Sequence, residues 1–74
     1  MKSQPLRILR MTDVEDRTGL GRTTIVELER QGMFPRRVPL TRATAGYVES
    51  EVADWIEGRK RLRDANNVLI FAEK

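Results

Sequence analysis

Two glycines, an arginine and two threonines form the stretch of this sequence whose residue types could bind a phosphate. The stretch reads Gly19-Leu20-Gly21 followed by Arg22-Thr23-Thr24, and such a loop either cradles a nucleotide phosphate or turns the chain between two helices. A loop of the GxxxxGK[ST] type would need glycine at position 16 and lysine at position 22, where the chain has Asp16 and Arg22. A dinucleotide fingerprint would need glycine at position 24. Both templates fail, so we interpret the glycines as a turn between helices.

Other kinds of chemistry are excluded by what the chain lacks. It contains no cysteine and no histidine, which rules out a disulfide scaffold, a thiol nucleophile, an imidazole base and a structural zinc site. Acidic residues such as Asp13, Glu15 and Asp16 gather at the expected starts of helices, where their interaction with the helix dipole accounts for them. We therefore expect no enzymatic activity and no cofactor or metal.

The length and the hydropathy of the chain limit its class. A chain of 74 residues can form one small domain. The N-terminal MKSQPLRILR has no apolar run typical of a signal peptide, and no segment approaches the roughly 20 apolar residues of a membrane span. We expect a cytoplasmic, nucleoid-associated protein with no membrane partner.

The net charge of +3 is modest, but its distribution is uneven. Eleven of the fourteen basic residues are arginines. Between Arg17 and Val48 the chain has six arginines, and only Glu27 and Glu29 are acidic. This segregation predicts one basic face and favours double-stranded DNA as a partner. On charge alone, a solvated surface accounts for the pattern equally well.

Two short helices are predicted on either side of the glycine turn. Thr12 is a suitable N-cap, with Glu15 completing a capping box, and Gly19 ends the first helix. The second helix begins near Arg22 and ends at Gly32. A short helix, a glycine-containing turn and a second amphipathic helix form a helix-turn-helix.

The second helix would present its N-terminal residues to the major groove of DNA. Arg22 can bind guanine bidentately or hold a phosphate, and Thr23 and Thr24 can donate to phosphate or contact a thymine methyl group. The alternative is structural: Thr23 caps the helix and Arg22 is solvated. We favour DNA contact for all three residues.

A basic hairpin follows, and we interpret it as a wing. Two strands, 36–40 and 47–49, flank the segment TRATAG, with Gly46 at its far end, and Pro39 indicates that the first strand lies at an edge. Such a hairpin can follow phosphates or enter the minor groove, although a solvated turn is the alternative. The predicted DNA-contacting residues of the wing and its flanks are Arg36, Arg37, Thr41, Arg42 and Thr44.

A third helix is predicted from Ser50 to about Arg63, with Trp55 as its largest apolar anchor. The fold class is therefore mainly α with a small β-hairpin: a winged helix-turn-helix domain over residues 1–63, with three helices and a two-stranded wing. The predicted core consists of Ile8, Val14, Leu20, Ile25, Leu28, Phe34, Val38, Leu40, Tyr47, Val52, Trp55 and Ile56.

Residues 64–74 are interpreted as an apolar tail. We expect Ala65-Asn66-Asn67 to break the helix and the apolar run 68–72 to form a strand. This strand could pack on the same chain, for example against the short strand expected at 6–11, or could join two chains, because strand edges pair readily. The residues of such a homodimer would be Val68, Leu69, Ile70 and Phe71.

The run from Ile8 to Arg59 resembles the AlpA family of phage-type regulators, which are MerR-like winged helix-turn-helix proteins related to small excisionases. The resemblance rests on TGLGRTTI, GMFPRRVPL and GYVESEVADWI. It implies a protein that binds DNA without enzymatic activity or a cofactor, either to regulate transcription or to direct excision of an integrated element. RNA polymerase or an integrase would then be a further partner.

The chain departs from the family pattern at two places. Val26 and Glu27 stand where the family often has Tyr-Arg, and Tyr47 stands where tryptophan is common. Because a carboxylate repels phosphate, Glu27 either accepts from a cytosine amine or faces away from DNA. Three functions stay open: a sequence-specific transcriptional regulator, an excisionase-like factor that binds and bends attachment-site DNA, and a protein-interaction module without DNA binding.

Overall fold

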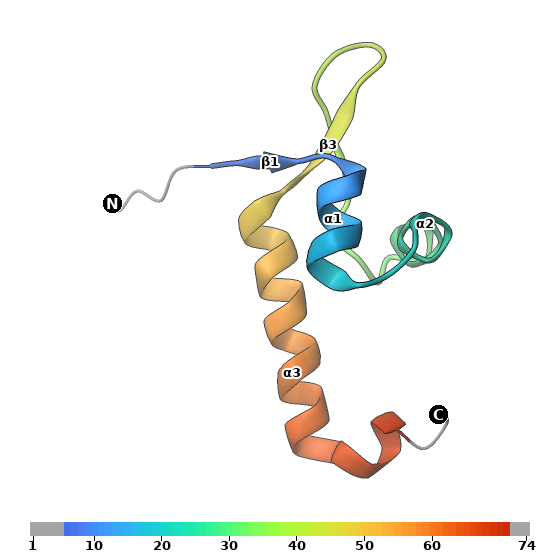
Figure 1. Cartoon of the computed structure of the whole chain (residues 1–74), viewed down its shortest axis with the longest axis vertical. Coiled ribbons are helices and arrows are strands. Elements are labelled where there is room, and N and C mark those ends of the chain that lie inside the picture. The colour runs from blue at the N-terminus through green and yellow to red at the C-terminus, as the bar shows by residue number, and fades with distance from the viewer. Residues whose placement is uncertain (1–5, 72–74) are drawn as a thin grey trace.

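The computed structural model describes the backbone of residues 6–71 and the side chains of residues 6–65. This part of the chain contains three helices and three short strands, and Figure 1 shows how they are arranged. The protein is mainly helical with a small antiparallel sheet, as predicted for a winged helix-turn-helix. In chain order the elements are β1 (Ile8–Leu9), α1 (Met11–Thr18), α2 (Arg22–Arg30), β2 (Val38–Pro39), β3 (Ala45–Val48) and α3 (Glu49–Phe71).

Helix α1 begins earlier than the sequence predicted. Its N-cap is Arg10, whose backbone N–H donates to the Asp13 carboxylate at 3.4 Å. The predicted capping box of Thr12 and Glu15 is therefore wrong. Strand β1 ends at Leu9, so the chain can turn into the helix at once, and Met11 packs against the core.

The turn between α1 and α2 is built on Gly19. This residue adopts a left-handed conformation with φ of +77°, and its N–H donates to the Glu15 carbonyl at 2.8 Å. Such a conformation favours glycine because a Cβ would be strained there. The Thr18 hydroxyl donates to the Val14 carbonyl at 2.8 Å and accepts from the Leu20 N–H at 3.1 Å. The predicted helix-to-helix turn is confirmed.

The sheet has three strands in the order β1-β3-β2, and all pairs are antiparallel. Pro39 lies in an edge strand, as predicted. The predicted hairpin is present, but β1 adds a third strand through the pairs Ile8↔Val48 and Leu9↔Tyr47. Gly46 lies inside β3 and not at the end of the loop. A Cβ there would collide with the Ile8 side chain and lie 2.9 Å from the Leu9 carbonyl oxygen, so no larger residue fits.

The core is a small cluster centred on an aromatic group. The Phe34 ring packs edge-on against Tyr47 and Trp55, with centroids 5.7 Å and 4.8 Å away. Trp55 is only half-buried, and its indole N–H donates to the Met33 carbonyl at 2.8 Å. The buried residues are Leu9, Val14, Ile25, Phe34, Tyr47 and Val52.

Two predictions about the core were wrong. Leu40 is 44% exposed, because it lies beyond the end of β2 in the hairpin loop. Leu9, which the prediction omitted, is buried. The remaining predicted residues are buried or partly buried. The core thus forms where β3 and α3 cover the helix-turn-helix.

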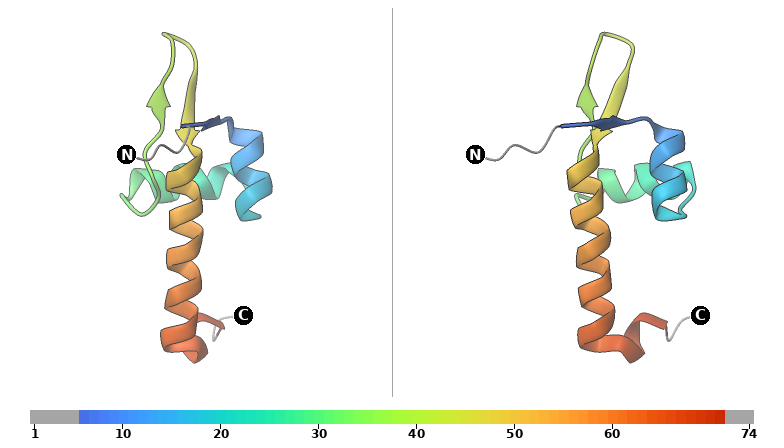
Figure 2. Two further views of the ribbon diagram at one scale, coloured as in Figure 1. Left: turned by 90° about the vertical axis from the view of Figure 1, so that its left-hand side faces the viewer. Right: turned by 60° about the vertical axis from the view of Figure 1, so that its left-hand side comes forward.

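Helix α3 begins where the sheet ends. The Glu49 N–H donates to the Arg7 carbonyl at 2.7 Å, and the Glu49 carboxylate pairs with Arg17 of α1, also at 2.7 Å. Figure 2 shows α3 leaving the body of the domain at the end opposite the hairpin loop. No helix in the described residues is long and apolar enough to cross a membrane.

The C-terminal half of α3 differs from the prediction. The helix continues to Phe71, so the predicted break at 65–67 and the predicted strand at 68–71 are wrong. Alanine is the strongest helix former and asparagine costs well under about 1 kcal/mol per residue, so these residues do not force a break. Ala72 lies outside the described residues. Whether the tail packs on its own chain or joins two chains stays a prediction.

Candidate nucleic-acid interface

Helix α2 has one buried face and one exposed face. Ile25 is fully buried and Leu28 packs against the core. With about 3.6 residues per turn, the opposite face carries Thr23, Val26, Glu27 and Arg30. Thr24 lies on one flank of this face and Arg22 on the other. The three predicted residues at the start of the helix are all exposed, but they do not share one face.

The N-terminus of α2 is free to meet an anion. Its N-cap, Gly21, has no side chain that could accept from the first backbone N–H groups. Within the described helix Arg22–Arg30, the first turn contains no acidic residue, whereas Asp13 occupies the first turn of α1. The positive end of the α2 dipole is therefore not neutralised by a side chain of its own first turn.

A groove joins the start of α2 to the hairpin. It has a volume of about 520 Å³. Arg22 of α2 and Arg37 next to β2 both line it, so the structure brings together one predicted residue of the recognition helix and one of the wing. The lining residues are Arg10, Met11, Thr12, Arg22, Arg37, Ala43, Ala45 and Tyr47.

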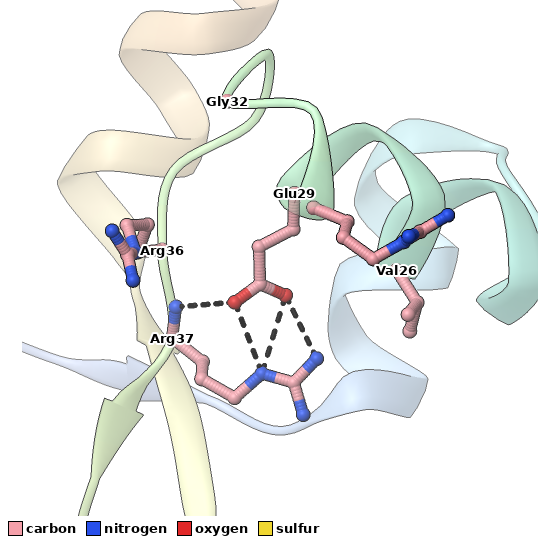
Figure 3. Close-up of a pocket in the computed structure, with 6 residues that line it drawn as sticks. Val26, Glu29, Gly32, Arg36 and Arg37 are labelled. Atoms are coloured by element: carbon pink, nitrogen blue, oxygen red, sulfur yellow. Dashed lines mark hydrogen bonds and ion pairs between the residues drawn. The ribbon is translucent and has the colours of Figure 1, made fainter.

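Glu29 connects α2 to the wing (Figure 3). Its carboxylate accepts from the Arg37 guanidinium, with the shortest contact 2.8 Å from Nη2, and from the Arg37 backbone N–H at 3.0 Å. The Tyr47 hydroxyl donates to the same carboxylate at 2.7 Å. The Glu29 side chain is 12% exposed. These contacts hold α2 against β3 and against the residue that precedes β2.

The ionisation of this cluster follows from its contacts. The hydrogen bonds from Arg37 lower the pKa of Glu29 to about 2 from an ordinary value of 4.5. Burial, together with the neighbouring Glu29 carboxylate, raises the pKa of Tyr47 to about 12. At neutral pH the cluster therefore holds an ionised Glu29, a charged Arg37 and a neutral Tyr47.

Glu27 has a different environment. Its carboxylate accepts from the Arg30 guanidinium at 3.0 Å and from the Gln31 side chain at 3.0 Å, all on the exposed side of α2. The hydrogen bond from Arg30 is the main cause of a lowered pKa for Glu27. The charge of Glu27 is thus offset by a neighbour one turn along the helix, and Glu27 lies on the same face as Thr23.

The loop of the hairpin is closed by its own hydrogen bonds. The Leu40 N–H donates to the Thr44 carbonyl at 2.7 Å, and the Thr41 hydroxyl accepts from the Ala43 N–H at 3.2 Å. The Thr41 hydroxyl is therefore used within the loop, and Thr44 is only partly exposed. Arg42 is exposed in the loop between β2 and β3.

The two adjacent wing arginines point in different directions. Figure 3 shows Arg37 directed toward Glu29 and Arg36 on the other side of the chain. Arg36 lines a second hollow of about 560 Å³ together with Glu51 and Asp54 of α3. The structure therefore does not place Arg36 in the groove that contains Arg22 and Arg37.

Sequence reasoning missed three contributors to this surface. The sequence indicated only the negative charge of Glu29, whereas its carboxylate binds Arg37 and Tyr47 of the wing. The sequence predicted Arg10 to lie in a strand, whereas it is the N-cap of α1 and lines the groove. Arg30 lies on the exposed face of α2, and its position one turn after Glu27 was a signal available in the sequence.

Comparison with known proteins identifies the family of the chain. Residues 7–62 match the model of the family described as prophage CP4-57 regulatory protein (AlpA). The chain is also 44% identical over 63 residues to the uncharacterized protein ORF88 of Enterobacteria phage P4, an alignment covering 80% of this chain and 72% of that protein. The chain therefore belongs to the AlpA family of prophage regulatory proteins.

Proposed function

We propose that this protein is a phage-type regulator that binds double-stranded DNA in a sequence-specific manner. Helix α2 enters the major groove with Arg22, Thr23 and Thr24 leading, and the hairpin contacts the backbone or the adjacent minor groove. The observation that carries the proposal is the exposed first turn of α2, which lies beside the basic hairpin and shares a groove with it.

Each part of this surface has a chemical role in the proposal. Arg22 binds a phosphate or a guanine, and the two threonines bind phosphate or contact a thymine methyl group. The exposed loop residue Arg42 reaches toward the minor groove. Glu27, neutralised by Arg30, accepts from a cytosine amine.

We further propose that the protein acts by binding and not by catalysis. The two strongly shifted groups are Glu29 and Tyr47, and the Glu29 carboxylate accepts hydrogen bonds from both Tyr47 and Arg37, so the shifts follow from a structural contact. Among the described residues, no group of histidine, cysteine, aspartate or glutamate residues could hold a metal ion. A DNA-bound protein of this kind would act on RNA polymerase or on an integrase.

Binding to two labelled duplexes tests the proposal: the region upstream of the protein's own coding sequence and a random sequence of equal length. Fluorescence anisotropy across a salt series should give an upstream preference of at least about 10³-fold and an affinity that falls as salt rises. Arg22→Ala should weaken binding about tenfold or more. The control Arg61→Ala removes an exposed charge on α3 and should leave the preference unchanged.

The outcomes separate the candidate functions. One protected operator favours a transcriptional regulator. Cooperative occupation of adjacent repeats, with bending of the duplex, would instead indicate an excisionase-like factor. Absence of salt-sensitive binding to either duplex would reject DNA binding and favour a protein-interaction module.

A further inference from the structure

Three arginines line the groove between α1, α2 and the hairpin. Arg10 comes from the N-cap of α1, Arg22 from the first turn of α2, and Arg37 from the residue before β2. Three separate elements thus each contribute one arginine to a space of about 520 Å³. A volume in this range accommodates groups as large as ordinary small ligands.

The groove differs in its lining charges from two other hollows on the described part of the surface. Among the described residues that line it, none is acidic. Glu29 lines the hollow shown in Figure 3, which has a volume of about 420 Å³, and Glu51 and Asp54 line the hollow beside Arg36. Among the described residues, the ion pairs include Arg37, which pairs with Glu29, but neither Arg10 nor Arg22. An anion in the groove would therefore meet two unpaired guanidinium groups and the remaining donors of Arg37.

Arg37 keeps donors for an anion despite its contact with Glu29. A guanidinium has five N–H donors, and the Glu29 carboxylate engages Nε and Nη2. Among the described residues Nη1 donates no hydrogen bond, so its two N–H groups can donate to an anion. Glu29 holds the guanidinium plane in place, so Arg37 needs little further ordering to bind.

The position of the groove identifies the anion. In B-DNA one sugar–phosphate backbone separates the major groove from the adjacent minor groove. A protein with α2 in the first and a hairpin in the second must straddle that backbone, and the space between its two elements must receive it. The small side chains of Ala43 and Ala45 leave room on the hairpin side.

We propose that this groove binds the DNA backbone between the two grooves, with Arg10, Arg22 and Arg37 as phosphate-binding residues. The inference rests on the proposed function and deepens it, because it assigns Arg10 to the interface and assigns Arg22 a phosphate. The Thr12 hydroxyl lines the same groove and is a further donor to a phosphate oxygen.

Salt dependence with a random-sequence duplex tests the role of Arg10. The slope of log K against log salt falls by about 0.9 for each lost phosphate contact on B-DNA. Arg10→Ala should lower the slope by this amount and weaken binding about tenfold at low salt. Arg10→Lys retains the charge and should restore the slope. The matched control Arg7→Ala removes an exposed arginine from the same segment, outside the groove, and should leave the slope near the wild-type value.

Two results would overturn the inference in distinguishable ways. If the wild type binds the duplex and Arg10→Ala behaves like Arg7→Ala, the groove does not hold the backbone, although DNA binding stands. If the wild type binds no duplex, the proposed function fails and the inference fails with it. Circular dichroism melting of each variant separates lost contacts from lost folding.

Replacing a single phosphate by a neutral methylphosphonate provides a second measurement. The replacement is made at each phosphate of the bound DNA site in turn. At one position it should weaken wild-type binding about tenfold and weaken Arg10→Ala binding much less, because the DNA change and the protein change remove the same contact. Equal losses for the two proteins at every scanned position would contradict the inference.

Discussion

Glu27 and Glu29 are separated by one residue on α2, yet they have opposite surroundings. Glu27 lies on the exposed face, with its side chain 47% exposed and paired to Arg30 within the same helix. Glu29 is 12% exposed and binds Arg37 and Tyr47 from the hairpin. One glutamate thus interacts within its helix and the other connects two parts of the domain.

The difference shows how position on a helix decides what a charge does. An exposed pair within one helix contributes little because water and salt screen it. A shielded carboxylate with a bidentate arginine and a tyrosine partner contributes more, because each bond is charge-assisted and its loss leaves a shielded group unsatisfied. We therefore expect stability to depend on Glu29 and DNA affinity to depend on Glu27.

Glu29→Gln should have the largest effect on stability. The substitution keeps the shape of the side chain but removes the charge that Arg37 and Tyr47 bind, which should cost about 1.5–3 kcal/mol of unfolding free energy. Urea denaturation measures this cost, and Glu27→Gln serves as the matched control on the same helix. Equal midpoints for the two variants would contradict the proposed difference between the glutamates.

Acid should weaken the protein through the same carboxylate. The pKa of Glu29 is lowered to about 2 from 4.5, so its contribution to stability is present above pH 4.5 and is lost as the pH falls toward 2. Unfolding free energies measured across this range should decrease with falling pH. The decrease should be smaller in Glu29→Gln, and an identical pH profile for both proteins would contradict the assignment.

Tyr47→Phe should have an intermediate effect. It removes one hydrogen bond to Glu29 and leaves the ring in the core, which should cost about 0.5–1.5 kcal/mol. The pKa of Tyr47 is raised to about 12 from 10.0, so its contribution is present below pH 10 and is lost as the pH rises toward 12. Denaturation at alkaline pH should show this loss in the wild type and not in the variant.

Glu27→Gln should have the smallest effect on stability, with a melting temperature indistinguishable from that of the wild type. It should, however, strengthen binding to random duplex DNA a few-fold, because it removes a negative charge from the exposed face of α2. Anisotropy measures this change. At the specific site the same substitution should lower affinity, because Glu27 is proposed to accept a hydrogen bond from a cytosine amine there. Unchanged affinity at that site would contradict this role.

Local patterns in the sequence were sufficient to predict much of the fold. Gly19 requires a left-handed conformation that marks the turn, and Pro39 cannot donate within a sheet, which marks the edge strand. The short strand expected at 6–11 is present as β1, but its pairing with β3 was not predicted, because β1 has only two residues and the pairing depends on the close approach that Gly46 permits. No local periodicity encodes such a contact.

The candidate site was predictable only in part. Arg22 could be assigned to the surface because it opens the second helix. Glu29 bonds to Arg37 and to Tyr47, which come from other parts of the chain. The pattern of residues along one helix therefore does not predict these bonds. Arg10 was missed because the start of α1 depends on where β1 leaves its partner strand.

The register of β1 against β3 also bears on how fast the protein folds. Ile8, close to the start of the described chain, pairs with Val48, the residue just before α3. The turn between α1 and α2 joins residues that are close in sequence and can form early. Pairing β1 with β3 instead costs the entropy of closing a loop that contains most of the domain. Closure of the sheet is therefore expected to limit the folding rate. During synthesis β1 could pair only after β3 has left the ribosome, so the complete proposed DNA-binding surface would form late.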